Sequence, residues 1–120
     1  MDKKAEKRRF REREEKKMEA RVQEALNPGG DKAVQRLAKF GKRPVRELIQ
    51  NLIDPGTTFY ELSRIAGFGM HYPGVEDVPC AGVVTGIGKV HGNWTMIFAN
   101  DSRVKAGTYF PITLKKHMRA

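Results

Sequence analysis

Residues 81–101, AGVVTGIGKVHGNWTMIFAND, decide what kind of fold the chain adopts. Two apolar runs rich in β-branched and aromatic residues flank HGN (residues 91–93), a turn sequence of the Gly/Asn type. The pattern predicts a β-hairpin, with a first strand over residues 83–90 and a second over residues 94–99. The second half of the chain is therefore expected to contain a small β-sheet.

The second predicted strand has few polar side chains on either face. Its two faces carry Trp94, Met96 and Phe98, and Thr95, Ile97 and Ala99. This composition predicts a strand that is buried on both sides. In the first strand, Gly86 and Gly88 are expected to weaken the strand or to mark bulges or close approaches of neighbouring groups.

A long charged helix is predicted at the start of the chain. Residues 2–26 contain neither Gly nor Pro, and Met18, Val22 and Leu26 form only a narrow apolar stripe. A stripe this thin cannot form a core alone, so the helix is expected to dock on a larger body or on a partner chain. NPGG (residues 27–30) ends it.

Two shorter helices follow. Asp31 is expected to cap a second helix over residues 32–40, which Gly41 ends. A third helix is predicted over residues 42–54, because Pro44 lies near its first turn and its apolar residues recur at helical spacing. Together they predict a helical hairpin that leads into a different architecture.

A short extended segment is predicted near residues 59–63, followed by a Gly/Pro-rich loop. After the β-hairpin a last helix begins at Pro111. No capping signal precedes Ala120, and a sheet of two or three strands leaves its edges uncovered. We therefore expect the chain to be the front part of a larger fold.

The chain has 120 residues, a net charge of +9 and one cysteine. This length corresponds to one small domain, and a lone cysteine excludes an internal disulfide and suits a reducing compartment. No apolar run reaches the roughly 18 residues of a membrane span, and the charged N-terminus does not resemble a secretory signal. A cytoplasmic location without membrane contact is expected.

The positive charge is spread along the chain. Residues 1–22 hold ten Lys or Arg and six Asp or Glu, out of 23 and 14 in the whole chain. Mixed charge of this kind is typical of a solvated helix surface and does not point to one nucleic-acid patch. Four aromatic residues that could stack on bases are scattered along the sequence: Tyr60, Tyr72, Tyr109 and Phe110.

Several candidate sites have simpler explanations. The three histidines are isolated and Cys80 has no neighbouring cysteine, so no metal site is expected. Glu76 and Asp77 have the chemistry of an acid and base, but adjacent acids in a loop are usually only solvated. GIG (residues 86–88) lies inside a strand and so does not fit a dinucleotide-binding motif, and no Walker A motif or nucleophile elbow occurs.

The strongest candidate is ANDSRVKAGTYFPITLKK, residues 99–116, which reads as a strand end, a loop and a helix start. Arg103 and Lys105 supply cations, and Gly107 permits an unusual backbone angle. The amides of residues 106–108 could converge on an anion or a developing oxyanion, and the helix N-terminus near Thr113 would add to the field. A plain basic strand–helix connection is the alternative.

Three segments of this chain carry a resemblance to a known family. They are GKRPVRELIQNLIDPGTTFYELS (41–63), GVVTGIGKV (82–90) and ANDSRVKAGTYFPITLKKHMRA (99–120). From residue 41 onward the sequence resembles the N-terminal part of the carboxyltransferase β subunits of biotin-dependent acyl-CoA carboxylases. The 3-methylcrotonyl-CoA carboxylase branch, to which geranyl-CoA carboxylase is similar, is the closest in pattern.

The resemblance implies an α/β (α+β) fold in two parts. Residues 1–54 would form a charged N-terminal helical region, and residues 55–120 the first part of a crotonase-like (ClpP/crotonase) ββα domain that is incomplete in this chain. The implied reaction transfers a carboxyl group from carboxybiotin to an acyl-CoA such as 3-methylcrotonyl-CoA, with no metal. Biotin would be carried by a partner subunit or domain.

The implied partners are acyl-CoA, the biotin carboxylase or biotin carrier subunit, and further carboxyltransferase subunits in a homo-oligomer. Nucleic acid and membrane are not among them. The N-terminal helix, residues 2–26, would contact neighbouring subunits. A cytoplasmic location of the bacterial type is implied in preference to the mitochondrial matrix.

The resemblance also implies where acyl-CoA binds. The candidate residues are Asn100, Arg103, Lys105, Ala106, Gly107, Thr108 and Tyr109. The backbone of Ala106 and Gly107 would supply one side of an oxyanion site, and the other side would lie beyond residue 120. Ala106 stands where the family usually has Gly, and Arg103 where a small polar residue is usual. No complete catalytic set is expected, so the chain alone should be inactive.

Two alternatives remain open from the sequence. One is a subunit of a biotin-dependent acyl-CoA decarboxylase of the glutaconyl-CoA type, which shares the fold and runs the reverse transfer with membrane partners. The other is a basic RNA-binding or scaffolding fragment that uses the N-terminal helix. Steeply salt-dependent binding to random RNA would indicate the second alternative.

Overall fold

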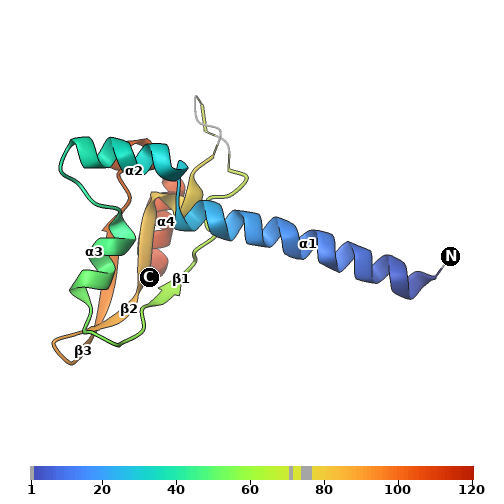
Figure 1. The fold of residues 1–120 in the computed structure, drawn as a ribbon, viewed down its shortest axis with the longest axis horizontal. Coiled ribbons are helices and arrows are strands. Elements are labelled where there is room, and N and C mark those ends of the chain that lie inside the picture. Colours follow the sequence, from blue (N-terminus) through green and yellow to red (C-terminus); the bar gives the residue numbers. More distant parts are fainter. Residues whose placement is uncertain (1, 71, 74–76) are drawn as a thin grey trace.

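The computed structural model describes residues 2–70, 72–73 and 77–120. The helices are α1 (Lys3–Leu26), α2 (Gly30–Lys39), α3 (Val45–Leu52) and α4 (Pro111–Arg119), and the strands are β1 (Tyr60–Leu62), β2 (Val83–Val90) and β3 (Asn93–Asn100). Two short 3₁₀ turns cover Pro79–Gly82 and Lys105–Gly107. The predicted succession of three helices, a small sheet and a last helix is confirmed (Figure 1).

The three strands form one antiparallel sheet in the order β1-β2-β3. The predicted hairpin is confirmed, because β2 and β3 pair along their whole length and turn at residues 91–92. The Asp54 carboxylate accepts hydrogen bonds from the backbone N–H groups of His91 (2.8 Å) and Gly92 (2.7 Å). The segment that follows α3 therefore holds the hairpin turn in place.

The glycines of β2 are required by close packing. A Cβ added at Gly86 would lie 2.4 Å from the Phe59 ring, and one at Gly88 would lie 2.7 Å from the Ile53 side chain. The β2–β3 register is continuous through both glycines, so neither forms a bulge. Of the expected explanations, close approach is confirmed.

The hydrophobic core lies between α3 and one face of the sheet. It consists of Ala25, Val45, Ile49, Ile53, Cys80, Val84 and Ile97. On the opposite face α4 packs against the sheet, because the His117 ring lies 5.1 Å from that of Phe98 and the Lys116 ammonium reaches the Val83 carbonyl. The core joins the N-terminal helices to the sheet and therefore crosses the predicted boundary near residue 54.

The prediction that β3 is buried on both sides is wrong. Ile97 points into the core and is buried, but Trp94 is 61% exposed and Phe98 is 44% exposed. Because α4 covers only part of the second face and β3 is an edge strand in the described part of the chain, these side chains remain in solvent. Trp94 instead contacts Tyr60, at 6.1 Å between ring centroids, and the Lys89 ammonium at 5.0 Å.

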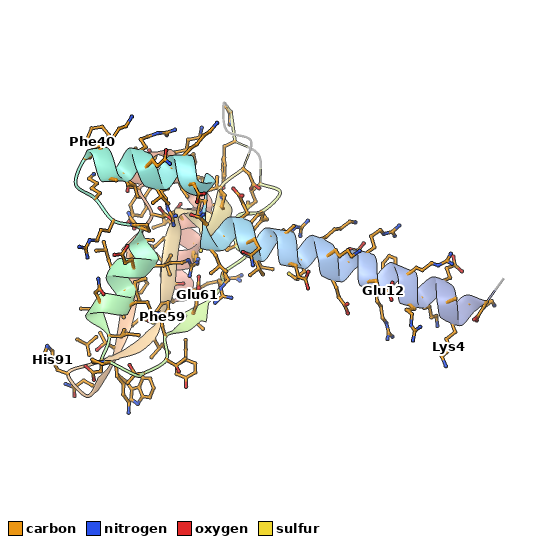
Figure 2. The ribbon with its side chains drawn as sticks, in the orientation of Figure 1. Lys4, Glu12, Phe40, Phe59, Glu61 and His91 are labelled. Atoms are coloured by element: carbon orange, nitrogen blue, oxygen red, sulfur yellow. The ribbon has the colours of Figure 1, made fainter. Side chains whose placement is uncertain are left out.

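The long charged helix is confirmed as α1, which extends away from the rest of the molecule (Figure 1). Its side chains point into solvent along most of its length (Figure 2), and among the described residues of α1 only Ala25 is buried. Met18, in the predicted stripe, is 48% exposed. The expected docking partner of α1 is thus not supplied by the other described elements.

The boundaries of the next two helices differ from the prediction. Asp31 was expected to cap the second helix, but α2 already begins at Gly30 and Asp31 lies within its first turn. The cap is Gly29, two residues earlier than expected, where the backbone is left-handed (φ 74°) and no side chain caps the helix. The third helix is shorter than residues 42–54, because the backbone is extended at Pro44 and again at Ile53.

Candidate functional site

The predicted ligand loop contains a tight left-handed turn. Lys105, Ala106 and Gly107 have φ values of 46°, 56° and 81°. Glycine adopts such angles without strain, whereas a residue with a Cβ at this position costs about 1 kcal/mol. The turn therefore projects the Lys105 side chain into solvent at the cost of backbone strain at Lys105 and Ala106.

Two of the three amides expected to form an anion cradle are used within the loop. The N–H of Gly107 donates to the Val104 carbonyl at 3.0 Å, and the N–H of Thr108 donates to the Lys105 carbonyl at 3.1 Å. The Thr108 hydroxyl donates to the same Lys105 carbonyl. The three amides do not converge on a common anion position in this structure, so anion binding depends more on side chains than on the backbone.

The N-terminus of α4 was expected to add to the field at the loop. Instead its first turn faces the protein: the Ile112 N–H donates to the Tyr72 hydroxyl at 3.2 Å, and the buried Thr113 hydroxyl donates to the Ala81 carbonyl at 2.7 Å. The start of α4 thus attaches the helix to Tyr72 and to the turn before β2, and its contribution to the field at the loop stays a prediction.

Arg103 is held inside the structure. Its guanidinium pairs with both oxygens of the Asp101 carboxylate, with Nε at 3.1 Å and Nη2 at 3.0 Å, and both side chains are almost fully buried. Its Nη1 donates to the Asn27 side chain at 2.7 Å. Arg103 therefore fastens the loop to the corner between α1 and α2, and Asp101 neutralises most of its charge.

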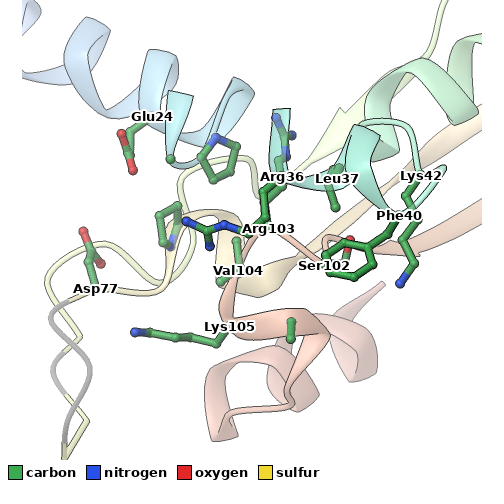
Figure 3. A pocket seen from close by; sticks show the side chains of 14 residues that line it. Glu24, Arg36, Leu37, Phe40, Lys42, Asp77, Ser102, Arg103, Val104 and Lys105 are labelled. Carbon is green, nitrogen blue, oxygen red and sulfur yellow. The ribbon is translucent and has the colours of Figure 1, made fainter. Parts of the chain in front are cut away.

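The loop forms one wall of a groove that the residues between α1 and α3 complete (Figure 3). The first hollow, of about 770 Å³, is lined by Glu24, Pro28, Gly29, Arg36, Leu37, Phe40, Lys42, Asp77, Pro79, Ser102, Arg103, Val104, Lys105 and Ala106. A second hollow of about 470 Å³ is lined by Gly41, Lys42, Arg43, Val45, Leu48, Asn100 and Ser102. The two hollows share Lys42 and Ser102 and therefore adjoin at these residues, and together they are called the groove below.

The groove contains some of the residues predicted from sequence. Arg103, Lys105 and Ala106 line the first hollow and Asn100 the second. Gly107 and Thr108 shape the turn but line neither hollow. One further predicted residue, Tyr109, contacts Asn100, since the Tyr109 hydroxyl donates to the Asn100 side chain at 3.3 Å.

The opposite wall of the groove was not among the residues predicted from the sequence. Arg36, Phe40 and Lys42 face the loop from α2 and the connection that follows it. They lie more than 60 residues from the loop in sequence, so no local pattern could join the two segments. The only signal was the basic and aromatic run KFGKR at residues 39–43.

A buried lysine lies beside the one cysteine. The Lys116 ammonium donates to the carbonyls of Cys80 (2.9 Å) and Val83 (2.6 Å) and lies 3.0 Å from the Cys80 sulfur. Burial raises the pKa of the Cys80 thiol, and the nearby Lys116 charge only partly offsets this effect. Cys80 is therefore a packed, protonated core residue and a poor nucleophile.

Cys80 should resist alkylation in the folded protein. Because the thiol is 2% exposed and its pKa is raised, iodoacetamide at pH 8 is expected to leave it unmodified over a time in which urea-unfolded protein reacts completely. Mass spectrometry of the intact chain measures both reactions, since there is no other cysteine. Equal rates with and without urea would contradict the buried position.

The other candidate sites, for a metal ion and for an acid–base pair, are not supported by the described residues. There, no group of three or more His, Cys, Asp and Glu side chains is arranged to hold a metal ion. His71 and Glu76, and hence the predicted Glu76–Asp77 pair, lie outside the part of the chain that the structure describes. Within that part, no helix has the length and apolar character needed to cross a membrane.

Comparison with known proteins identifies a family for most of the chain. The sequence profile of the carboxyl transferase domain matches residues 37–120. The methylcrotonoyl-CoA carboxylase beta chain, mitochondrial, of Dictyostelium discoideum is 50% identical over 105 residues, which is 88% of this chain and 18% of that protein. The chain thus spans about a fifth of the length of such relatives.

Solved structures give the same result for the fold. The beta subunit of P. aeruginosa geranyl-CoA carboxylase aligns with a TM-score of 0.61 and 34% identity, over 92% of this chain and 18% of that one. Transcarboxylase 12S, whose crystal structure contains methylmalonyl-coenzyme A, aligns with a TM-score of 0.69 and 30% identity, over 91% of this chain and 21% of that one. Both similarities extend beyond residues 37–120 into the N-terminal helices.

Proposed function

This chain belongs to the carboxyl transferase family, and we propose that it forms the N-terminal part of a carboxyltransferase β subunit in a biotin-dependent acyl-CoA carboxylase. The subunit would transfer a carboxyl group from carboxybiotin to an acyl-CoA related to 3-methylcrotonyl-CoA. The methylcrotonoyl-CoA carboxylase relative and the geranyl-CoA carboxylase neighbour support this substrate class. The role of this chain is to build one wall of the acyl-CoA site.

The observation that carries the proposal is the groove beside the Lys105–Gly107 turn. An acyl-CoA is long and carries several phosphate charges, and the two joined hollows are lined by Arg36, Lys42 and Lys105. Cationic side chains bind phosphate through charge-assisted hydrogen bonds. The groove therefore presents the cationic side chains that the phosphates of the ligand require.

The thioester end of the ligand is proposed to lie at the Lys105–Gly107 turn. Ala106 lines the first hollow, and among the described residues its N–H makes no backbone hydrogen bond, whereas the N–H of Gly107 donates to Val104. Ala106 is therefore the better placed donor for an oxyanion, and the second donor would come from outside this chain. Carboxybiotin, carried by a partner subunit or domain, supplies the carboxyl group when it is bound.

We also propose that α1 contacts neighbouring subunits. Apart from its last turns, this helix is exposed along its length and extends away from the body of the protein (Figure 1). Phe10 and Met18 remain more than 45% exposed on it. A helix of this length gains most of its stability from packing against other elements, and a second carboxyltransferase subunit would provide that packing. A cytoplasmic location stays a prediction.

The experiment uses the assembled carboxylase that contains this chain. Replacing Lys105 with alanine is expected to raise the KM for acyl-CoA about tenfold, because the groove loses one cationic hydrogen-bond donor to the ligand. Lys115→Ala is the matched control, since Lys115 is exposed on α4 and lines neither hollow.

Three outcomes would argue against the proposal. If the enzyme does not carboxylate any acyl-CoA, the proposed function is wrong. If Lys115→Ala has the same effect as Lys105→Ala, the groove is not the binding site. Decarboxylation without carboxylation would instead favour a subunit of the glutaconyl-CoA type.

A further inference from the structure

We infer that the connection between α2 and α3 recognises the adenosine 3′-phosphate end of the acyl-CoA, with Lys42 binding the phosphate and Phe40 stacking on the adenine. This inference rests on the proposed function, because it assigns one end of the same groove. It assigns a specificity-determining role to Phe40 and Lys42, which lie outside the Lys105 loop predicted from the sequence.

The Phe40 ring is placed for contact with a ligand and not for the core. Helix α2 buries Ala33 and Leu37, whereas Phe40 at its C-terminal cap is 74% exposed and lines the first hollow. Leaving a large apolar ring in solvent forgoes stabilisation that burial would supply. Purine bases stack on exposed aromatic rings, so an adenine would cover this surface.

The charges in the groove are distributed unevenly. Figure 3 shows the carboxylates of Glu24 and Asp77 near one end and Phe40, Lys42 and Ser102 near the other. In the part of the chain that the structure describes, Lys42 forms no ion pair, and the charge of Arg103 is balanced by Asp101. The end that contains Lys42 is therefore the more favourable for a dianionic phosphate.

Lys42 also lies at the junction of the two hollows. It lines both of them together with Ser102, whose hydroxyl is a further hydrogen-bond donor. The phosphate would thus meet a cation and a hydroxyl at one point, while the adenine lies on the Phe40 ring.

The orientation follows from the position proposed for the thioester. If the thioester oxygen lies at Ala106, the ligand must run away from the Lys105–Gly107 turn, and of the two ends of the groove the one at Phe40 carries the cation Lys42, whereas the other carries the carboxylates of Glu24 and Asp77 (Figure 3). Arg36 on α2 also lines the first hollow and offers a cation to the diphosphate. The terminal nucleoside then reaches Phe40 and Lys42.

The test compares acyl-CoA with acyl-dephospho-CoA, which lacks only the 3′-phosphate, as substrates of the assembled carboxylase. Lys42→Ala is expected to raise the KM for acyl-CoA about fivefold and to leave the KM for the dephospho substrate within about twofold, because an exposed ion pair contributes about 1 kcal/mol. Lys42→Glu should enlarge the difference. Phe40→Ala should raise both KM values, since both ligands contain adenine.

Lys39→Ala serves as the control, because Lys39 is an exposed cation on α2 that lines neither hollow. If Lys42→Ala and Lys42→Glu weaken both substrates equally, or if Lys39→Ala discriminates as strongly, the assignment of the 3′-phosphate is overturned while acyl-CoA binding stands. If the unmodified enzyme uses neither substrate, the proposed function itself is wrong. Lys42 and Phe40 are exposed, so these variants should fold normally.

Discussion

The variant Gly67→Ala is expected to lose about 4 kcal/mol of folding free energy, the largest effect predicted for a single methyl group in this chain. Gly67 is buried and has a φ of 90°, which an L-residue adopts only with strain. A Cβ at this position would lie 2.1 Å from the Val78 carbonyl oxygen and 3.0 Å from the Ala81 amide. Both are backbone atoms, so no side-chain rotation relieves the contact.

The matched control is Gly69→Ala. Gly69 also has a positive φ, of 73°, but no atom lies within 4 Å of the added Cβ. Only the backbone strain of about 1 kcal/mol remains there. Urea unfolding followed by circular dichroism measures both variants, and equal losses would show that the 78–81 turn does not pack on Gly67 as described.

The second large effect is expected for Arg46→Met, which should lower the free energy of unfolding by about 3 kcal/mol. The Arg46 guanidinium pairs with the Glu61 carboxylate, with Nη2 at 2.7 Å from Oε1, and also donates to the Ala25 carbonyl at 3.3 Å. The Glu61 side chain is only 2% exposed. Methionine fills a similar volume but leaves this buried carboxylate with Arg64 as its remaining cation.

The loss should depend on pH. Burial alone would raise the pKa of Glu61, but the hydrogen bonds and charges of Arg46 and Arg64 outweigh burial and lower it. A carboxylate with a lowered pKa in the folded state stabilises the protein above its unfolded pKa of about 4.3, and this contribution is lost as the pH falls through the folded value. The difference between Arg46→Met and the parent protein should therefore be largest near neutral pH and shrink in acid.

Arg43→Met provides the control for Arg46→Met. Arg43 pairs with Glu47 at 3.5 Å, but these side chains are 64% and 50% exposed. An exposed pair of this kind contributes less than about 0.5 kcal/mol. If the two arginine variants lose the same stability, or if the Arg46→Met loss does not change with pH, the Arg46–Glu61 pair does not contribute as a buried ion pair.

The sequence patterns that succeeded were local ones. The NPGG and DPGTT breakers, the HGN turn and Pro111 lie at or next to element boundaries, because glycine and proline act on the backbone of their own residue and its neighbours. One local prediction was wrong. Asp31 was expected to cap the second helix, but Gly29 is the cap and α2 already begins at Gly30.

Only one of the two walls of the candidate site could be predicted from the sequence. The basic loop around Lys105 stood out because its cations, glycine and following proline are contiguous. Arg36, Phe40 and Lys42 became part of the site only when the chain folded, and the expected convergence of three amides was prevented by hydrogen bonds within the turn. Exposure of Trp94 could not be foreseen either, because it depends on how far α4 extends across the sheet.

The sequence by itself determined the helices, the β-hairpin, the membership of the carboxyl transferase family and the position of the basic loop, since these depend on neighbouring residues or on motifs read in order. Only the tertiary structure decided that Arg103 forms a buried ion pair with Asp101, that Lys116 is buried against Cys80, and that the groove is lined by both Lys105 and Lys42. The physical reason is that burial, ion pairing and the shape of a cavity arise between segments far apart in the chain, where no spacing rule connects the partners.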